Sequence, residues 1–182
     1  MITLLDATTA DAGRIAELHL VSWRAAYRGI VSDHFLEHVA PVNRRETWRI
    51  RLAPENIGEI RVRMAFAAPD DLVGFSCVSR MDDPLWGVNL DNLHVRPGML
   101  GTGIGRLLMT EAAAWVAQQH PGRPLHLFVY EKNARARAFY ERMQGELVEH
   151  TTGRSPDGGN AVTLRYQWRN VTALASLKRS AP

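Results

Sequence analysis

The residues best suited to chemistry form a glycine-rich segment that separates an apolar stretch from an amphipathic one. Glycines occupy positions 98, 101, 103 and 105 within the run Leu93-His94-Val95-Arg96-Pro97-Gly98-Met99-Leu100-Gly101-Thr102-Gly103-Ile104-Gly105-Arg106. Glycine allows backbone N–H groups to turn toward one point and allows a bulky anion to come close. A helix that begins near Gly103 adds about half a positive charge at its N-terminus. Together these features predict a pyrophosphate-binding site.

Two other phosphate-binding motifs can be excluded by their spacing. A P-loop ends in Gly-Lys followed by Ser or Thr, whereas Arg106 and Leu107 follow Gly105 here. A dinucleotide-binding fold needs Gly-x-Gly-x-x-Gly early in a parallel βαβ unit, and the glycines at 101, 103 and 105 have a different spacing. A purely structural tight turn remains the alternative interpretation.

A second segment with chemical potential follows the next apolar stretch. Asn133 is a good N-cap for a helix that should run to about Met143. Ala136 and Tyr140 share a face of this helix, so a ligand could approach closely at Ala136 and meet the Tyr140 hydroxyl one turn later. The other interpretation of Tyr140 is a buried aromatic residue whose hydroxyl bonds to the protein.

The elements that must position these segments predict one mixed α/β sheet. We expect residues 1–169 to form a single domain and residues 170–182 to form a frayed tail. Hydrophobic periodicity and turn residues predict strands at 2–7, 62–66, 72–79, 88–95, 125–130, 146–151 and 161–168, and helices at about 8–27, 33–38, 41–52, 103–120 and 133–143.

Composition and charge exclude several classes of protein. Apolar residues make up 46% of the 182 residues and charged residues 23%, so bulk disorder is excluded. Cys77 is the only cysteine, which excludes an internal disulfide and a cysteine-based zinc site; we expect a cytoplasmic protein without a metal. No stretch is typical of a signal peptide or a membrane span. The net charge of +3 comes from scattered arginines, which suits a small phosphate ligand better than nucleic acid.

The two segments together resemble the GNAT acyltransferase superfamily in its bacterial form. Residues 100–105 resemble its motif A, and the Asn-x-x-Ala-x-x-x-Tyr pattern at Asn133, Ala136 and Tyr140 resembles its motif B. The resemblance covers residues 2–168 and extends to Ser22-Trp23-Arg24-Ala25-Ala26-Tyr27-Arg28-Gly29. It implies an acetyl-CoA-dependent N-acetyltransferase. The implied fold is a mostly antiparallel sheet of about seven strands that splays between strands four and five.

The same resemblance implies a binding site for acetyl-CoA as co-substrate. The pantetheine arm would lie between strands four and five, and the loop amides would bind the pyrophosphate. Phe139 would flank the arm near the thioester. The implied coenzyme-binding residues are Leu93, His94, Val95, Leu100, Gly101, Thr102, Gly103, Ile104, Gly105, Arg106, Asn133, Ala136, Phe139 and Tyr140.

The implied reaction is direct attack of a neutral amine on the thioester in a ternary complex. It needs a deprotonated amine, a polarised carbonyl and a proton for the departing thiolate. The resemblance assigns the second task to the Val95 backbone N–H and the third to Tyr140.

The chain departs from the family pattern at Leu100 and Asn89. Leu100 replaces the usual Gln or Arg at the start of the loop, so we expect somewhat weaker phosphate binding. Asn89 lies six residues before Val95, where many members carry a glutamate base. Asp91 is the candidate replacement, because strand alternation predicts that it shares a face with Asn89 and Leu93. An exposed or hydrogen-bonded carboxylate, and proton transfer through water without a base, are the alternatives.

The residues that meet the acceptor are less constrained. Trp23, Tyr27, Arg28 and Asn89 are the candidates; simple core packing is the alternative for Trp23 and Tyr27. A polyamine, an aminoglycoside, an amino acid or a protein N-terminus would all be allowed, although the arginines of the first helices disfavour a polycation. A non-catalytic acyl-CoA-binding module or sensor is the alternative function. We expect no nucleic-acid or membrane partner, and analogy allows a homodimer.

Overall fold

A seven-stranded mixed sheet runs through the molecule, with the strand order β1-β2-β3-β4-β5-β7-β6. The computed structural model describes residues 1–177, apart from the side chains of residues 80–82. Every neighbouring pair of strands is antiparallel except β4 and β5, which confirms the predicted fold class. The strands are β1 (Thr3–Asp6), β2 (Ile60–Phe66), β3 (Leu72–Asp83), β4 (Gly87–Val95), β5 (Leu125–Tyr130), β6 (Glu146–Arg154) and β7 (Asn160–Trp168).

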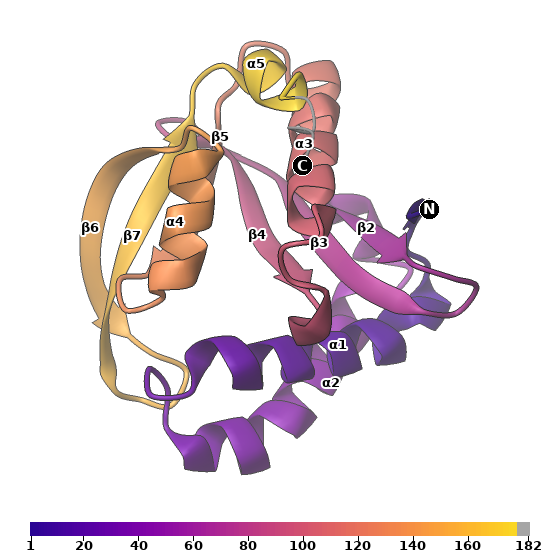
Figure 1. The fold of residues 1–182 in the computed structure, drawn as a ribbon, viewed down its shortest axis with the longest axis vertical. Coiled ribbons are helices and arrows are strands. Elements are labelled where there is room, and N and C mark those ends of the chain that lie inside the picture. Colours follow the sequence, from indigo (N-terminus) through magenta and orange to yellow (C-terminus); the bar gives the residue numbers. More distant parts are fainter. Residues whose placement is uncertain (178–182) are drawn as a thin grey trace.

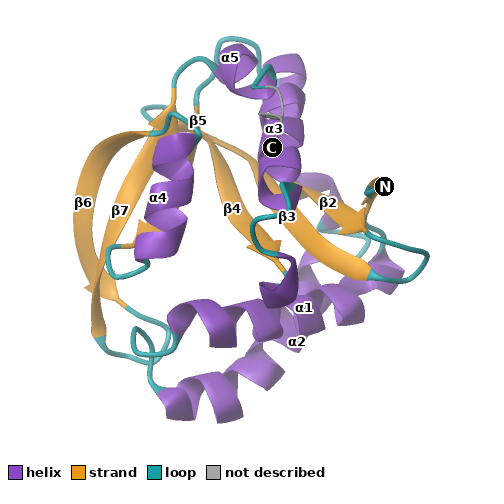
Figure 2. Ribbon diagram, in the orientation of Figure 1, coloured by secondary structure: helices purple, strands orange, loops and turns teal. Residues whose placement is uncertain are grey.

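Helices lie on both faces of this sheet (Figure 1, Figure 2). On one face, α1 and α2 pack against β2 and β3, with Trp48 and Phe75 fully buried between them. On the other face, α3 buries Ile104 and Leu108 against Val73. Successive side chains of a strand point to opposite faces of the sheet, so alternate residues pack against the helices on each face. The helices are α1 (Ala12–Tyr27), α2 (Ala40–Arg51), α3 (Ile104–Gln119), α4 (Ala134–Arg142) and α5 (Val171–Ala175).

The connection between α1 and α2 differs from the two separate helices that we expected there. A π-helical turn, Phe35–Val39, leads directly into α2. Pro41 therefore lies in the first turn of α2. Pro41 lacks a backbone N–H and so removes one donor from this continuous helical segment; the turn before it is π-helical, with the Ala40 N–H donating to the Phe35 carbonyl oxygen.

The parallel strands β4 and β5 converge at their beginnings and then diverge (Figure 1). Their pairing is limited to Val88 with Leu125 and Asn89 with His126. Gly87 makes the convergence possible, because a Cβ atom there would lie 2.2 Å from the Pro124 carbonyl oxygen. Beyond Asn89 the facing edges of the two strands are not paired with each other. Such edges leave backbone N–H and C=O groups available to a ligand.

A β-bulge interrupts β4 at Asp91. Leu90 pairs with Val78 of β3 and Asn92 pairs with Cys77, so Asp91 is an extra residue in the ladder. An extra residue reverses the alternation of side chains beyond it. The side chains of β4 before Asp91 and after it therefore alternate between the two faces of the sheet in opposite phase, and this change lies within the predicted site.

The bulge overturns one expectation about β4. Leu90 and Leu93 both pack against the cluster that contains α3, although they are three positions apart in the chain. Asp91 and Asn92 both bond to Arg51 of α2, on the opposite face. The prediction that Asp91 and Leu93 share a face is therefore wrong.

The end of the described chain is a short helix. The Asn170 side chain accepts a hydrogen bond of 2.9 Å from the Ala173 N–H and caps α5. Val171 and Leu174 are buried in the cluster that contains α3. The expectation of a frayed tail is wrong for residues 170–177, and residues 178–182 lie outside the described part. Within the described residues, no helix has the length and apolar character needed to cross a membrane.

Candidate active site

The glycine-rich loop joins the end of β4 to the start of α3 and presents unpaired donors. Gly101 and Gly103 have positive φ angles of 82° and 89°. Within the described part of the chain, the backbone N–H groups of residues 101–105 donate no hydrogen bond. The first N–H groups of a helix have no partner within the helix and carry its positive dipole end. The loop is therefore a ready site for an anion, and its chemistry fits the pyrophosphate of coenzyme A.

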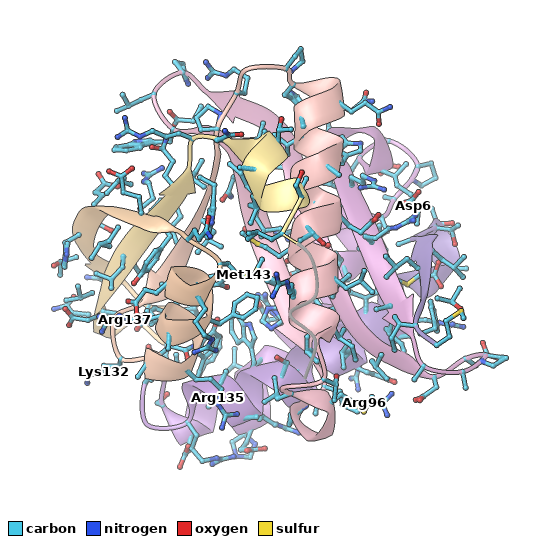
Figure 3. The ribbon with its side chains drawn as sticks, turned by 45° about the horizontal axis from the view of Figure 1, so that its top comes forward. Asp6, Arg96, Lys132, Arg135, Arg137 and Met143 are labelled. Atoms are coloured by element: carbon cyan, nitrogen blue, oxygen red, sulfur yellow. The ribbon has the colours of Figure 1, made fainter. Side chains whose placement is uncertain are left out.

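Three of the predicted coenzyme-binding residues meet at the mouth of this loop. A Cβ atom placed on Gly105 would lie 3.6 Å from the Phe139 ring and 3.7 Å from a Val95 methyl carbon. The end of β4, the start of α3 and the second half of α4 thus converge, and α4 comes from a distant part of the chain. Of the basic residues labelled in Figure 3, Arg135 of α4 lies nearest to the space between α4 and α3, whereas Lys132 and Arg137 lie on the outer side of α4. Arg96, beside the loop, forms an ion pair with Asp71.

Asn133 is the N-cap of α4, as its place in the sequence predicted. Its side chain accepts a hydrogen bond of 3.2 Å from the Ala136 N–H and so caps α4. Ala136 is half-buried against the main core cluster. This cap fixes the direction of α4 and hence the position of Tyr140; a contact between Asn133 and coenzyme A stays a prediction.

Tyr140 lies at the centre of the site with its hydroxyl unmatched. Its ring packs 5.9 Å from that of Tyr166 and 6.0 Å from that of Trp168, measured between centroids. Its hydroxyl bonds to no other residue within the described part, so the alternative of a hydroxyl satisfied by the protein is not what the structure contains. Burial, and then the nearby Tyr27, raise the Tyr140 pKa far above its ordinary value. The hydroxyl therefore stays protonated, as a proton donor must.

Asp91 is not a free carboxylate. It forms an ion pair with Arg51, which also donates a hydrogen bond of 3.0 Å to the Asn92 side chain. This contact matches the alternative of a hydrogen-bonded strand carboxylate, and a base role for Asp91 stays a prediction. Asn89, at the position of the missing glutamate, has a buried Oδ1 atom without a hydrogen-bond partner in the described part of the chain.

His94 belongs to a buried polar cluster on the α1 side of β4. Its Nδ1 atom lies 2.9 Å from the Ser22 hydroxyl, and its ring centroid lies 4.4 Å from that of His19. Trp48 donates a hydrogen bond of 2.9 Å to His19 Nδ1. The His94 side chain therefore points away from the α3 face, and only its backbone can serve the coenzyme. His19 and Ser22 were not predicted; their spacing of three on one face of α1 was the only signal.

These buried histidines predict an acid-sensitive stability. Burial lowers the pKa of His94 to about 3 and that of His19 well below its ordinary value. Both are neutral when folded, whereas the unfolded chain protonates them near pH 6.5, so the unfolded state binds more protons below that pH. Their contribution is complete above about pH 6.5 and is lost as the pH falls toward 3, by up to about 1.4 kcal/mol per pH unit for each histidine.

Urea denaturation between pH 7.5 and pH 5 checks this expectation. The His94→Gln variant should show a shallower decline of the unfolding free energy with falling pH than the native chain. His150 is exposed, so His150→Gln is the matched control and should keep the native slope. Equal slopes for the native chain and His94→Gln would contradict the burial argument.

The candidate acceptor residues divide into two groups. Trp23 and Tyr27 pack together with ring centroids 5.3 Å apart, and Tyr27 lies 5.1 Å from Tyr130 at the end of β5. Tyr27 is also close enough to Tyr140 to raise the Tyr140 pKa, after the larger effect of burial. The rings of Trp23, Tyr27 and Tyr130 therefore lie on the α1 side of the gap, by which we mean the place where β4 and β5 diverge. Arg28, by contrast, is exposed and pairs with Asp33 and Glu37 on the surface.

Other features of the described chain include a hollow and a long-range loop contact. A hollow whose lining includes Asp6, Leu52 and Trp115 lies away from the predicted residues; Figure 3 labels Asp6 on the opposite side from α4. In the described chain, no three His, Cys, Asp or Glu side chains are grouped as metal ligands. The Ser32 N–H donates a hydrogen bond of 2.7 Å to Asp157, so the β6–β7 turn contacts the loop after α1.

Comparison with known proteins places this geometry among acetyltransferases. The family model described as "Acetyltransferase (GNAT) family" matches residues 23–145. The chain is 24% identical to the probable N-acetyltransferase Rv2775 of Mycobacterium tuberculosis, over all of this chain and 96% of that protein. It is 38% identical to the streptothricin acetyltransferase of Streptomyces lavendulae over 46% of this chain and 43% of that protein. Among solved structures, the PaiA N-acetyltransferase of Thermoplasma acidophilum in complex with coenzyme A has a TM-score of 0.71 at 19% identity, covering 92% of this chain and 99% of that one.

Proposed function

The chain belongs to the GNAT family of acetyltransferases and is an acyltransferase, and from this premise we propose that it acetylates a primary amine of a small molecule or peptide. The donor is acetyl-CoA, and the amine attacks directly within a ternary complex. The observation that carries the proposal is the convergence of the unpaired loop amides, the divergent edges of β4 and β5, and the unmatched Tyr140 hydroxyl at one place.

The binding half of the site is made of backbone. The N–H groups of residues 101–105 would hold the pyrophosphate, and the unpaired edge of β4 at Leu93 and Val95 would bond to the amides of the pantetheine arm. Phe139 and Val95 both lie beside Gly105, where a Cβ atom would be in van der Waals contact with each of them. Leu100 is exposed and supplies no side-chain donor, so binding would depend on the backbone.

The chemical half of the site consists of two donors. When bound, acetyl-CoA supplies an activated acetyl group and a sulfur leaving group. The Val95 N–H would stabilise the negative charge that develops on the carbonyl oxygen. Tyr140 would give its proton to the sulfur, because burial keeps its hydroxyl protonated and no described residue occupies it.

The amine would lose its proton through ordered water. Asp91 is engaged by Arg51, so it does not present a free carboxylate to the amine. Asn89 cannot act as a base, but its buried and unpaired Oδ1 can accept a hydrogen bond from water or from the amine. The site would therefore use Asn89 to position the nucleophile and solvent to remove its proton.

Calorimetric titration with acetyl-CoA, followed by a thiol-release screen against mixed amines, tests the proposed function. Micromolar binding with amine-dependent release of thiol would support it. Binding without release from any amine would favour the acyl-CoA-binding module or sensor instead. Absence of binding would show that Leu100 has disabled the loop, and the proposal would then be wrong.

A further inference from the structure

The arginines of α1 and α2 differ in how their charge is balanced. Most lie within 4.0 Å of a carboxylate, namely Arg14, Arg24, Arg49 and Arg51, and so does Arg28 directly after α1. Arg45 is exposed to solvent. Arg44 is half-buried, yet no carboxylate in the described part of the chain lies within that distance of it. Its side-chain hydrogen bonds there go to a neutral atom, the Oδ1 of Asn43.

The Arg44 guanidinium lies on the acceptor side of the gap. It stacks 4.3 Å from the centroid of the Trp23 ring. Burial raises the pKa of Tyr27 and of Tyr130, and the charge of Arg44 lowers both in part, so Arg44 is near both tyrosines. Burial lowers the pKa of His94, and Arg44 lowers it further. Arg44 therefore adjoins the residues that surround the gap next to β4.

An unbalanced cation in this position is costly. Burial disfavours the charged form of Arg44, and the nearby Arg51 adds repulsion, so both lower the Arg44 pKa. A guanidinium does not lose its proton in a protein, so the cost persists until an anion arrives. Asp91 cannot fully relieve it, because Arg51 holds that carboxylate.

We infer that the acceptor amine also carries a carboxylate, which the Arg44 guanidinium binds while the amine faces the gap between β4 and β5. The Trp23 ring holds one face of the guanidinium, and Nε and Nη2 both donate to Asn43 Oδ1, so the edge formed by Nη1 and Nη2 is the one that would bind the carboxylate. The inference rests on the proposed function and names its acceptor class as amino acids. A polyamine would instead bring a second cation toward Arg44 and Arg51.

A matched series of acceptors tests this class. Straight-chain ω-amino acids, from glycine to 6-aminohexanoate, are compared with unsubstituted alkylamines and diamines of the same length. Each series keeps the primary amine and changes only the far group, and the change in length scans the distance from Arg44 to the acetyl group. The expected result is a higher kcat/KM for the ω-amino acids at one or more lengths. Equal or better turnover of alkylamines or diamines at every length overturns the inference and leaves the proposed function intact.

Two variants assign the preference to Arg44. Arg44→Gln should raise the KM for the best ω-amino acid by about tenfold, with a smaller effect on kcat and none on the alkylamine of equal length. Arg45→Gln, one position along on the exposed side of α2, is the matched control and should keep the native values. An equal loss with ω-amino acids and alkylamines in Arg44→Gln would show that Arg44 only supports Trp23, and would overturn the inference.

Direct binding separates this inference from the proposed function. The ω-amino acids are titrated into the protein saturated with coenzyme A. Binding that Arg44→Gln abolishes, without any acetylation, would show that Arg44 binds a carboxylate but would refute the proposed function and, with it, the assignment of that ligand as the acceptor. If the ω-amino acids neither bind nor are acetylated at any length, the inference is overturned, whatever the titration with acetyl-CoA shows.

Discussion

Replacement of Tyr140 by phenylalanine should lower kcat by about 100-fold, the lower range for loss of a general acid. The dissociation constant of acetyl-CoA should stay nearly unchanged, because the ring that packs against Tyr166 and Trp168 is kept and only the hydroxyl is lost. That hydroxyl bonds to no described residue, so its removal breaks no bond within the fold. Steady-state kinetics by thiol release, with calorimetry for the coenzyme, measures both quantities.

Tyr166 supplies the matched control for this experiment. It is a neighbouring buried tyrosine, but its hydroxyl donates a hydrogen bond of 2.8 Å to Glu141. Tyr166→Phe should therefore cost about 1 kcal/mol of unfolding free energy, the usual net value of one hydrogen bond, and leave kcat close to native. Unchanged turnover in Tyr140→Phe would refute the proton-donor role, and equal losses in the two variants would point to packing rather than chemistry.

Substitution of Gly103 by alanine should weaken acetyl-CoA binding by about tenfold. Gly103 is the N-cap of α3 with a φ angle of 89°, a conformation that costs an L-residue about 1–2 kcal/mol. The loop is largely exposed, so a free variant can relax away from this conformation and must regain it when the pyrophosphate binds. The strain would then appear as lost affinity, with little effect on kcat at saturating coenzyme.

Gly98 provides the control within the same loop. It has no positive φ angle, and a Cβ atom there would meet nothing within 4 Å. Calorimetric titration with coenzyme A should therefore give a near-native dissociation constant for Gly98→Ala and a clearly raised one for Gly103→Ala. Equal constants for both variants would remove Gly103 from the coenzyme site.

The Gly103 and Tyr140 experiments separate binding from chemistry. If the loop binds and Tyr140 donates the proton, one variant changes the dissociation constant and the other changes kcat. A variant that changed both would mean that α4 moves when coenzyme A binds. The contact between Gly105 and Phe139 is where the loop and α4 would communicate.

Much of the fold follows from local signals in the sequence. The bounds of β5 agree with the predicted 125–130, and the Asn133 cap starts α4 where its side-chain chemistry requires. The glycines at 101 and 103 adopt the positive φ angles for which glycine is suited. Such signals act within a few residues, so a single sequence is enough to detect them. The resemblance to the GNAT motifs was local in the same sense, and the matched family model confirms it.

The partners of the charged and polar side chains could not be predicted in this way. Arg51 meets Asp91 across 40 positions of the chain, and Ser22 meets His94 across 72. Such contacts depend on how α1 and α2 pack against the sheet. In the described part of the chain, the lack of a carboxylate within 4.0 Å of Arg44 is a property of that packing too, because it depends on where the acidic side chains lie.

The β4 strand shows both what local sequence signals predict and what tertiary packing decides. Its sequence determined that a strand leads into a glycine-rich loop and a helix, since alternating apolar residues and glycines act locally. Only the tertiary structure decided which side chains of that strand face the acceptor, because the bulge at Asp91 arises from register with β3. The spacing of the apolar residues does change from two to three between Leu90 and Leu93, but this spacing alone does not show which residue leaves the ladder or which face Asp91 takes. The sequence by itself therefore determined the strand, the glycine-rich loop and the helix that are proposed to bind coenzyme A, whereas packing across the sheet decided which side chains surround the proposed acceptor.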